Sequence, residues 1–477
     1  MILFLLLVVV VLWWATLWLA LPIDWDTLTL PNLVLWHVVP PLALVLAWGV
    51  GKHLRAWRTT RRERLAKEAK EAEEKQAQEA ALAAHRQALE ARRASIECRG
   101  VWASLSMLPE WNENPVDSCI LLEQHADTVR SLGREGAVKK SLQHVFEAAF
   151  AQAEALAWLP VFIFSKDSYP GAVEQDHCTL AWKRAVEACQ SRDVFQSLCP
   201  PSSLECGFLP GVGDIVNRSL ALFEQDPYLP AFLLLGFDSP LAEMLEWDDF
   251  DFSAPKPNHA VVALLVARPG LVAAAAESLP LSPGGKEVDP NLVPYWERPA
   301  VRVDAPSAWG RMPACLQPGF LEKLPPLAAL TRPRSAAAAE RESTCVHRIQ
   351  QAIEEAFIDA GLRDLAFAGE GGAQVKQGED EIAPEIGWAV FDGFAENRRC
   401  QIATALVECR SDLEFVAQST HARNELGDAG AANGVLMQAL AFIRAGQLEK
   451  PVLLTEAFDK GGIGVSLVRP CVVVGFS

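Results

Sequence analysis

An internal repeat is the feature that most constrains what this chain can fold into. Near the carboxyl end, a turn of small residues at 427–434 leads into an apolar run with helical spacing, and strand patterns follow at 452–454 and 465–468. The same order of turn, helix and strands occurs earlier, beginning at Gly213 and Asp214. A doubled order of helix and strands predicts an internally duplicated α/β fold with mixed sheets.

Length, charge and cysteine usage limit the class of protein. With 477 residues, the chain is too long for a single core, so more than one domain is expected. The net charge of −17 argues against a nucleic-acid partner, because basic residues gather only in one short segment after the apolar amino-terminal region. Eleven cysteines lie without a CxxC motif or regular spacing, which is typical of reduced thiols in the cytosol.

Two apolar runs open the chain. Residues 1–21 carry no charged side chain and are long enough to cross a bilayer. A cleaved signal peptide is the alternative, but no basic segment precedes the run. An acidic connector at 22–31 is followed by the second run at 33–51, which two adjacent prolines are expected to kink. We therefore expect a transmembrane hairpin over residues 1–51.

Basic and mixed-charge residues follow the hairpin. Six cations lie close together, at Lys52, Arg55, Arg58, Arg61, Arg62 and Arg64. By the positive-inside rule they place the rest of the chain in the cytoplasm. Residues 52–97 predict a charged stalk helix. A solvated helix is favoured over a coiled coil, because the apolar seam that starts at Leu65 is broken at Glu79.

The remaining chain has a globular composition and divides into three parts. Residues 98–277 form a first half with a helical lead-in, residues 278–343 a connection rich in Pro and Gly, and residues 344–477 a second half. Helices are expected at 118–131, 137–159, 179–189 and 344–360, and strands at 160–164, 365–368, 388–391 and 414–417, with 397–409 either a helix or a long strand.

Side chains with catalytic potential are few. The sequence has no GxSxG elbow, Walker A loop or HExxH motif. His177 and Cys178 adjoin in the chain, so their side chains are expected to point apart, which argues against a catalytic pair. Cys206 is the best-placed candidate nucleophile, but no neighbouring residue marks it as activated. The acidic clusters at 246–252 and 379–381 match no EF-hand spacing; the first, interleaved with aromatics, is a candidate partner contact.

The turn Gly427-Asp428-Ala429-Gly430-Ala431-Ala432-Asn433-Gly434, with the helix and strands after it, resembles the second-half segment of thiolase-like folds of the β-ketoacyl-synthase type. The resemblance implies a five-layer α-β-α-β-α body. It also implies a catalytic His beside the glycine of this turn and a nucleophilic Cys at the start of the first repeat's helix. The matching positions here hold Asp428 and residues 211–214. Because a carboxylate would repel the negative charge that develops in acyl transfer, we expect no catalytic residues. We also expect no metal-binding or cofactor-binding residues.

The plan of hairpin, stalk and degenerate body resembles the type VI secretion lipase-adaptor family. This resemblance implies a bacterial inner-membrane protein whose cytoplasmic body binds a lipase effector and delivers it to the secretion spike. A homodimer is a further implication of the thiolase-like body. The alternative is a divergent acyl-transfer enzyme or acyl-ligand binder at the inner membrane, with Cys206 as nucleophile. A membrane-tethered scaffold with a lasting partner is a third interpretation.

Overall fold

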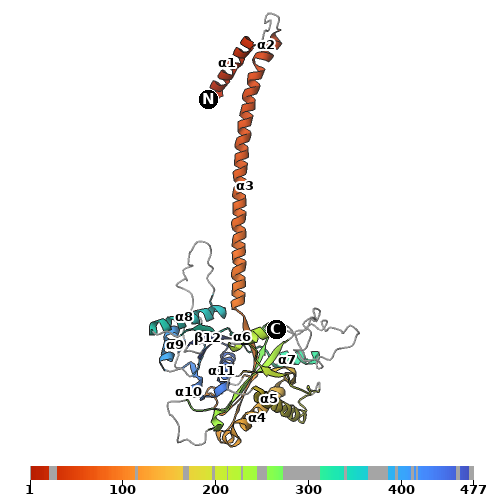
Figure 1. The fold of residues 1–477 in the computed structure, drawn as a ribbon, viewed down its shortest axis with the longest axis vertical. Helices are drawn as coiled ribbons and strands as arrows, with labels where there is room; N and C mark the ends of the chain where they lie inside the picture. The colour runs from red at the N-terminus through yellow and green to blue at the C-terminus, as the bar shows by residue number, and fades with distance from the viewer. Residues whose placement is uncertain are drawn as a thin grey trace, which may run out of the picture. The chain divides into compact units, whose positions relative to one another are not determined.

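The computed structural model describes residues 2–20, 29–112, 116–164, 171–195, 199–211, 213–226, 229–243, 255–271, 312–337, 341–363, 385–392, 396–409, 413–414, 417–457 and 462–471. Over these residues the chain has a mixed α/β fold (Figure 1). It divides into two compact units, one comprising Met1–Arg86 and a body that begins at Gln87.

Apolar helices make up the start of the first unit: α1 (Ile2–Ala20), α2 (Leu30–His37) and the beginning of α3 (Val39–Arg92). Of the helices that the structure describes, one run, Val34–Arg92, is long and apolar enough to cross a membrane. The apolar stretch of α1, Leu7–Leu19, is shorter. One span is therefore supported by length and composition, and the second span of the predicted hairpin stays a prediction.

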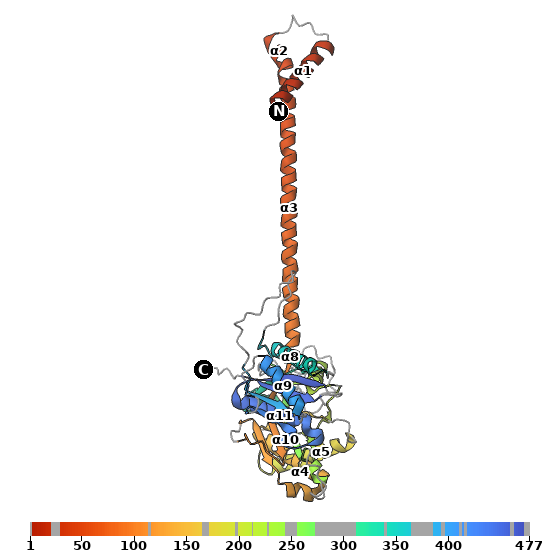
Figure 2. The same ribbon diagram turned by 90° about the vertical axis from the view of Figure 1, so that its left-hand side faces the viewer.

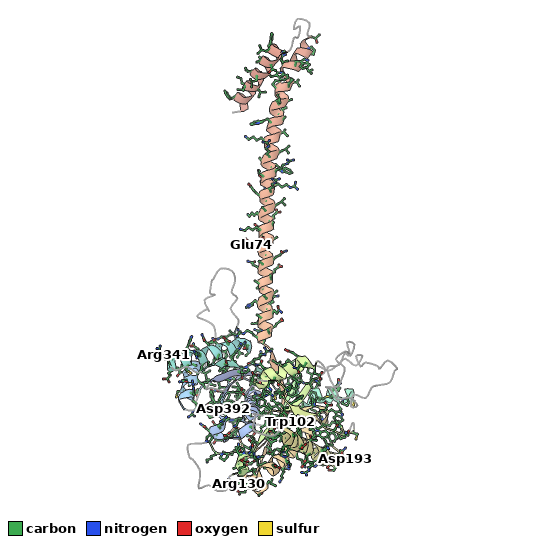
Figure 3. The ribbon with its side chains drawn as sticks, in the orientation of Figure 1. Glu74, Trp102, Arg130, Asp193, Arg341 and Asp392 are labelled. Carbon is green, nitrogen blue, oxygen red and sulfur yellow. The ribbon has the colours of Figure 1, made fainter. Side chains whose placement is uncertain are left out.

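Helix α3 runs without a break from the apolar region into the predicted stalk. Its side chains from Lys52 to residue 84 are all exposed, and Figure 3 shows them projecting from the helix, with Glu74 among them. This exposure agrees with a solvated stalk. The helix ends at Arg92 rather than at residue 97, because Ser95 and Ile96 are already buried in a strand.

The body contains one sheet of twelve strands. The order is β10-β9-β11-β12-β7-β1-β6-β5-β3-β4, with β2 beside β1 and β8 beside β12. The strands are β1 (Ser95–Leu105), β2 (Cys119–Glu123), β3 (Val161–Ile163), β4 (Cys206–Phe208), β5 (Ala231–Asp238), β6 (Ala260–Ala267), β7 (Ala328–Thr331), β8 (Arg334–Ala336), β9 (Trp388–Phe391), β10 (Ser419–His421), β11 (Val452–Ala457) and β12 (Ile463–Pro470).

The order of the strands repeats between the two halves. In the first half, β4, β3 and β5 are parallel neighbours, and β6 is antiparallel to both β5 and β1. In the second half, β10, β9 and β11 are parallel neighbours, and β12 is antiparallel to both β11 and β7. Strands β1 and β7 pair at the centre and join the halves. The predicted internal duplication is confirmed.

Helices lie in three layers around the two halves of the sheet (Figure 1 and Figure 2). The helices are α4 (Ala126–Gln152), α5 (Gly171–Gln190), α6 (Ile215–Gln225), α7 (Gln317–Lys323), α8 (Glu342–Asp359), α9 (Glu396–Glu408), α10 (Ala422–Glu425) and α11 (Asn433–Leu448). Helices α6 and α11 share one core with the inner face of both halves, where Leu234 and Leu454 lie. Leu233 faces α4 and α5, and Leu453 faces α8 and α9. Because neighbouring strand residues face opposite sides, the layers follow the order α-β-α-β-α.

Two sequence-based assignments are wrong. The helix predicted over 118–131 starts as strand β2, and α4 begins only at Ala126. The reason is long-range, because β2 pairs in parallel with β1 and that pairing overrides the local pattern. The strand predicted at 414–417 is displaced, because the observed strand β10 begins five residues later, at Ser419, where it pairs with β9.

The stretch 278–343, predicted as a connection, contains α7, β7 and β8 among its described residues, because pairing with β1 and β12 draws it into the sheet. Other helix assignments agree with the structure. Residues 397–409 form a helix, α9, and the helices at 179–189 and 344–360 correspond to α5 and α8. The predicted helix at 137–159 is the end of α4 followed by a short 3-10 helix, η2 (Glu154–Trp158). The predicted strand at 365–368, the acidic clusters at 246–252 and 379–381 and most of the 278–343 connection lie outside the described residues.

Candidate functional site

The first central helix, α6, begins at Asp214. Its carboxylate accepts a hydrogen bond of 2.9 Å from the backbone N–H of Asn217 and one of 2.6 Å from the Asn217 side-chain amide. Asp214 is therefore the N-cap of α6 and supplies an acceptor to an N–H group that the helix leaves without a partner. The position where the resemblance expects a nucleophilic thiol holds a helix-capping carboxylate.

The second central helix, α11, follows a turn built around Asp428. The carboxylate of Asp428 accepts a hydrogen bond of 3.0 Å from the N–H of Gly430 and another from the side-chain amide of Asn433. The Asn433 side-chain oxygen in turn accepts 3.0 Å from the N–H of Ala429. Asp428 thus holds the turn 428–433 together, in the place where the resemblance expects a catalytic imidazole.

A carboxylate from the first half holds the same turn. Asp238, at the end of β5, accepts a hydrogen bond of 3.0 Å from the N–H of Ala431. Its other oxygen accepts 3.0 Å from Nε of Arg134 on α4. The side chain is only 5% exposed. Gly430 has a φ of +57°, and a Cβ on it would collide with Asp238, so this turn requires glycine. Asp238 therefore couples the two halves at the start of α11.

Phe164, directly after β3, lies between the starts of the two central helices. The guanidinium of Arg218, in the first turn of α6, lies 5.2 Å from the centre of its ring. On the other side, a Cβ on Gly434 of α11 would lie 3.4 Å from the same ring. The two helix starts are therefore neighbours, and an aromatic ring and an arginine lie between them.

Cys206, the candidate nucleophile, lies on β4 and is half-buried. Its thiol interacts with that of Cys178 on α5, and burial raises the pKa of the Cys178 thiol well above its ordinary value. Activation would require a lowered pKa, so the Cys178 thiol is not an activated one.

His177, which adjoins Cys178 in sequence, belongs to a different environment. Its Nε2 lies 3.7 Å from a carboxylate oxygen of Glu135, whereas Cys178 is fully buried in the first-half core. The two side chains therefore point apart, as expected, although on a helix rather than on an extended segment. Burial lowers the pKa of His177.

His259, at the start of β6, is completely buried. Its Nε2 and the Ser141 hydroxyl of α4 form a hydrogen bond of 2.8 Å. Burial lowers the pKa of His259 to about 4, so the ring is neutral at physiological pH. It links the outer helix layer to the sheet.

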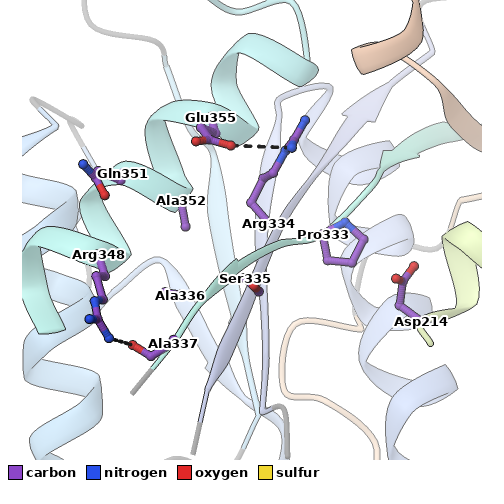
Figure 4. A pocket seen from close by; sticks show the side chains of 10 residues that line it. All are labelled: Asp214, Pro333, Arg334, Ser335, Ala336, Ala337, Arg348, Gln351, Ala352 and Glu355. Carbon is purple, nitrogen blue, oxygen red and sulfur yellow. Dashed lines mark hydrogen bonds and ion pairs between the residues drawn. The ribbon is translucent and has the colours of Figure 1, made fainter. Parts of the chain in front are cut away.

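A polar cavity of about 580 Å³ lies where the start of α6 meets β8 and α8 (Figure 4). Asp214 comes from the first half, and Arg334, Arg348, Gln351 and Glu355 from the second. The residues that complete the described lining are Pro333, Ser335, Ala336, Ala337 and Ala352. This set offers guanidinium, carboxylate, amide and hydroxyl groups to a polar partner, and it contains no thiol or imidazole.

Both arginines of this cavity are held by the chain itself. Arg334 forms ion pairs with the fully buried Asp359 and, at 3.5 Å, with Glu355. Arg348 donates a hydrogen bond of 3.2 Å to the carbonyl of Ala337. Sequence reasoning missed this cavity, because its walls come from segments that nothing in a local pattern brings together.

A second cavity of about 280 Å³ lies between α4 and α5 at the end of β5. It is lined by Arg134, Glu135, Val138, Val173, Glu174, His177, Phe237 and Asp238. Among the described residues, no group of three or more His, Cys, Asp or Glu side chains could hold a metal ion. Both cavities offer charged and polar side chains for recognition.

In the first unit, two tryptophans of α1 donate the hydrogen bonds that two prolines of α3 cannot donate. The prolines at positions 40 and 41 have no N–H to donate to the carbonyls of Trp36 and His37, four residues earlier. The indole of Trp13 donates a hydrogen bond of 2.8 Å to the first carbonyl, and that of Trp14 one of 3.2 Å to the second. Helix α1 therefore supplies the donors that α3 lacks.

No protein-family model matches this chain, and no curated protein sequence matches it. Several solved structures are similar in fold at low identity. The peroxisomal 3-ketoacyl-CoA thiolase of Saccharomyces cerevisiae, described as five-layered and built from two core domains of identical topology, is 8% identical with a TM-score of 0.37. The match covers 80% of this chain and 98% of the thiolase.

Two bacterial enzymes give comparable matches. The 3-oxoacyl-[acyl-carrier-protein] synthase III of Aquifex aeolicus is 13% identical, with a TM-score of 0.35 and coverage of 78% of this chain and 99% of the synthase. OleA of Xanthomonas campestris is 9% identical, with a TM-score of 0.34 and coverage of 79% and 98%. At TM-scores below 0.5 these likenesses carry no argument about activity, and the duplicated topology rests on the strand order of this chain.

Proposed function

We propose that this chain is a membrane-anchored adaptor whose thiolase-like body has lost acyl-transfer chemistry and binds a partner protein. A pair of aspartates at the starts of the central helices carries the proposal. Acyl transfer there would need a thiolate and hydrogen-bond donors for an oxyanion. Asp214 and Asp428 supply carboxylates instead, and these accept hydrogen bonds from the chain's own N–H groups. Donors occupied in this way are not available to a substrate.

The membrane anchor in this proposal is a hairpin of two spans. Inside a bilayer, each backbone carbonyl needs a donor from the protein. The hydrogen bonds from Trp13 and Trp14 to the carbonyls left by the prolines meet that need. The basic residues that begin at Lys52 favour a cytoplasmic location for the body. An inner-membrane anchor with a cytoplasmic body follows.

The partner we propose is a lipase effector, which the adaptor delivers to the spike of a type VI secretion machine. The support is the resemblance of the hairpin, stalk and body plan to lipase adaptors. The polar cavity at the start of α6 is the candidate contact, because it opens on the body surface and offers charged groups of both signs. Dimerisation of the body stays a prediction that sedimentation of the solubilised chain tests.

Site-specific photo-crosslinking of the full chain in its native membrane tests this function. A photoreactive residue at Ser335, in the cavity, should crosslink to a lipase or a secretion component. The same probe at Asp193, an exposed position after α5, serves as the control and should not. Recovery of neither partner from Ser335, with the chain intact in the membrane, would refute the adaptor.

The alternative function, an acyl-transfer enzyme or acyl-ligand binder at the membrane, depends on Cys206. Incubation of the full chain with cerulenin, followed by intact-mass measurement, distinguishes this alternative from the adaptor. We expect no adduct, because the Cys206 thiol is half-buried and only partly accessible to the inhibitor. A stable adduct that disappears in Cys206→Ser would favour the enzyme.

A further inference from the structure

Six cations encircle helix α3 directly after its apolar segment. They are Lys52, Arg55, Arg58, Arg61, Arg62 and Arg64, all exposed, with Glu63 as the single acidic residue among them. At about 100° of rotation per residue, Lys52 and Arg55 lie on one side of the helix, whereas Arg61 and Arg64 lie on the other. The positive charge therefore surrounds the helix instead of forming one face.

Two tryptophans are interleaved with these cations. The ammonium of Lys52 lies 5.5 Å from the centre of a Trp48 ring, and the guanidinium of Arg61 lies 5.3 Å from that of Trp57. Both rings are exposed, at 42% for Trp48 and 53% for Trp57. Exposed tryptophan beside lysine and arginine is typical of the interface between a bilayer and water.

The length of the apolar segment places the cations at that interface. From Leu30 to Gly51 the helices rise about 33 Å, at 1.5 Å per residue, which matches a hydrocarbon core of about 30 Å. A helix that lies flat on a membrane carries its cations on one polar face. Cations on all sides instead suit a helix that stands upright through the headgroup layer.

We propose that this basic collar, the six cations with Trp48 and Trp57, binds the headgroups of anionic phospholipids; the inference rests on the proposed membrane anchor. Arginine and lysine pair with phosphate oxygens, and a negative leaflet attracts cations that adjoin a span. Nucleic acid is the less suitable polyanion, because α3 beyond the collar carries Glu68, Glu71 and Glu74, and the chain has a net charge of −17.

Spin-labelled lipids measure this selectivity on the full chain. The chain is reconstituted in phosphatidylcholine vesicles that contain spin-labelled phosphatidylglycerol or spin-labelled phosphatidylcholine, and the motionally restricted fraction gives a relative association constant. We expect about a fivefold preference for phosphatidylglycerol in about 0.1 M salt, where the Debye length is about 10 Å. We expect it to fall towards unity in about 1 M salt, where the Debye length is roughly 3 Å.

Substitution of cations by glutamine tests which part of α3 causes the preference for phosphatidylglycerol. Arg55→Gln/Arg58→Gln/Arg62→Gln should lower a fivefold preference to about twofold, because it removes half of the cations of the collar and their contributions multiply. Lys67→Gln/Lys70→Gln/Lys75→Gln removes the same charge from the same helix and should leave the preference unchanged. Beginning about 22 Å beyond Lys52 along the helix, these lysines are more than a Debye length from the headgroups.

The possible outcomes distinguish failure of the lipid-binding collar from failure of the proposed membrane anchor. If sodium carbonate extracts the chain from vesicles, the membrane anchor itself is wrong. An inserted chain with equal association constants for both lipids would overturn the collar alone, as would equal losses in the two triple variants. Tight, collar-dependent retention of a duplex oligonucleotide by the detergent-solubilised chain, without lipid selectivity, would assign the collar to nucleic acid and also overturn the proposal.

Discussion

The indole N–H of Trp13 donates a hydrogen bond to the backbone carbonyl of Trp36, 2.8 Å away. That carbonyl would otherwise lack a partner, because the residue four positions later is Pro40. Trp14 stands in the same relation to His37 and Pro41. Two indoles of α1 thus donate to backbone carbonyls whose usual helical donors are replaced by prolines of α3. These hydrogen bonds connect α1 to the end of α2.

We predict that Trp13→Phe/Trp14→Phe loosens this contact. Interhelical side-chain hydrogen bonds in membranes contribute about 0.6–1.7 kcal/mol each, so the loss of both should speed hydrogen exchange at the amides of residues 38, 39 and 42 by about tenfold or more. The measurement is hydrogen exchange of the full chain in nanodiscs. Trp48→Phe, whose indole faces Lys52, is the matched control and should leave these amides unchanged. Equal exchange in both variants would contradict the role of the pair.

Asp359 joins the end of α3 to the body. Its fully buried carboxylate accepts a hydrogen bond of 2.8 Å from Arg92 and one of 2.9 Å from Arg334. Asp359→Ala removes the buried carboxylate that accepts hydrogen bonds from two half-buried guanidinium groups, so we predict a loss of about 2–3 kcal/mol in the free energy of unfolding. Glu355→Ala removes a half-exposed carboxylate from the same arginines and should cost less than about 1 kcal/mol. Urea unfolding of the solubilised chain measures both, and similar losses would count against the prediction.

Gly430 is a point of close approach between the two halves. Gly430→Ala adds a Cβ that meets Asp238 at a φ of +57°, so we predict a loss of about 2–4 kcal/mol. Gly270→Ala is the control, because Gly270 has a similar φ of +70° but no atom of the described residues lies within 4 Å of the added Cβ. Its cost should stay near 1 kcal/mol, roughly that of the backbone conformation alone. Thermal unfolding of the two variants distinguishes collision from backbone strain.

Acid should destabilise the body through His259. Its pKa is about 4 when folded and roughly 6.5 when unfolded, so the unfolded chain binds the extra proton between these values. The stabilising contribution is therefore complete above about pH 6.5 and falls by about 3 kcal/mol as the pH approaches 4. His259→Gln, which keeps a polar group beside Ser141, should flatten this dependence. An unchanged slope in unfolding between pH 7 and 4 would exclude His259 as its source.

Local patterns predicted much of the fold. The Gly-Asp turn, helix and strand order that recurs at Asp214 and Asp428 identified the duplication, because helix period, apolar runs and capping residues act over a few positions. The aspartates themselves were visible at both helix starts. The same local reasoning failed at 118–131, where β2 takes its conformation from pairing with β1.

The candidate site was only partly predictable. Cys206 was the best thiol by position along the chain, but its surroundings include Cys178 on another element, which spacing cannot reveal. Arg348 entered no sequence-based hypothesis, because an arginine on a helix is usually a solvated charge. Its place in a cavity depends on β8 and the start of α6 arriving beside it.

By itself, the sequence determined the apolar amino-terminal segment, the charged helix and a doubled α/β body without Cys or His at its helix starts, since each depends on residue types and short-range periodicity. Tertiary structure alone decided that Asp238 holds the turn at Ala431, 193 residues away, and that Asp359 holds Arg92. Such contacts follow from burial, because a carboxylate removed from water must find donors wherever the packed chain presents them.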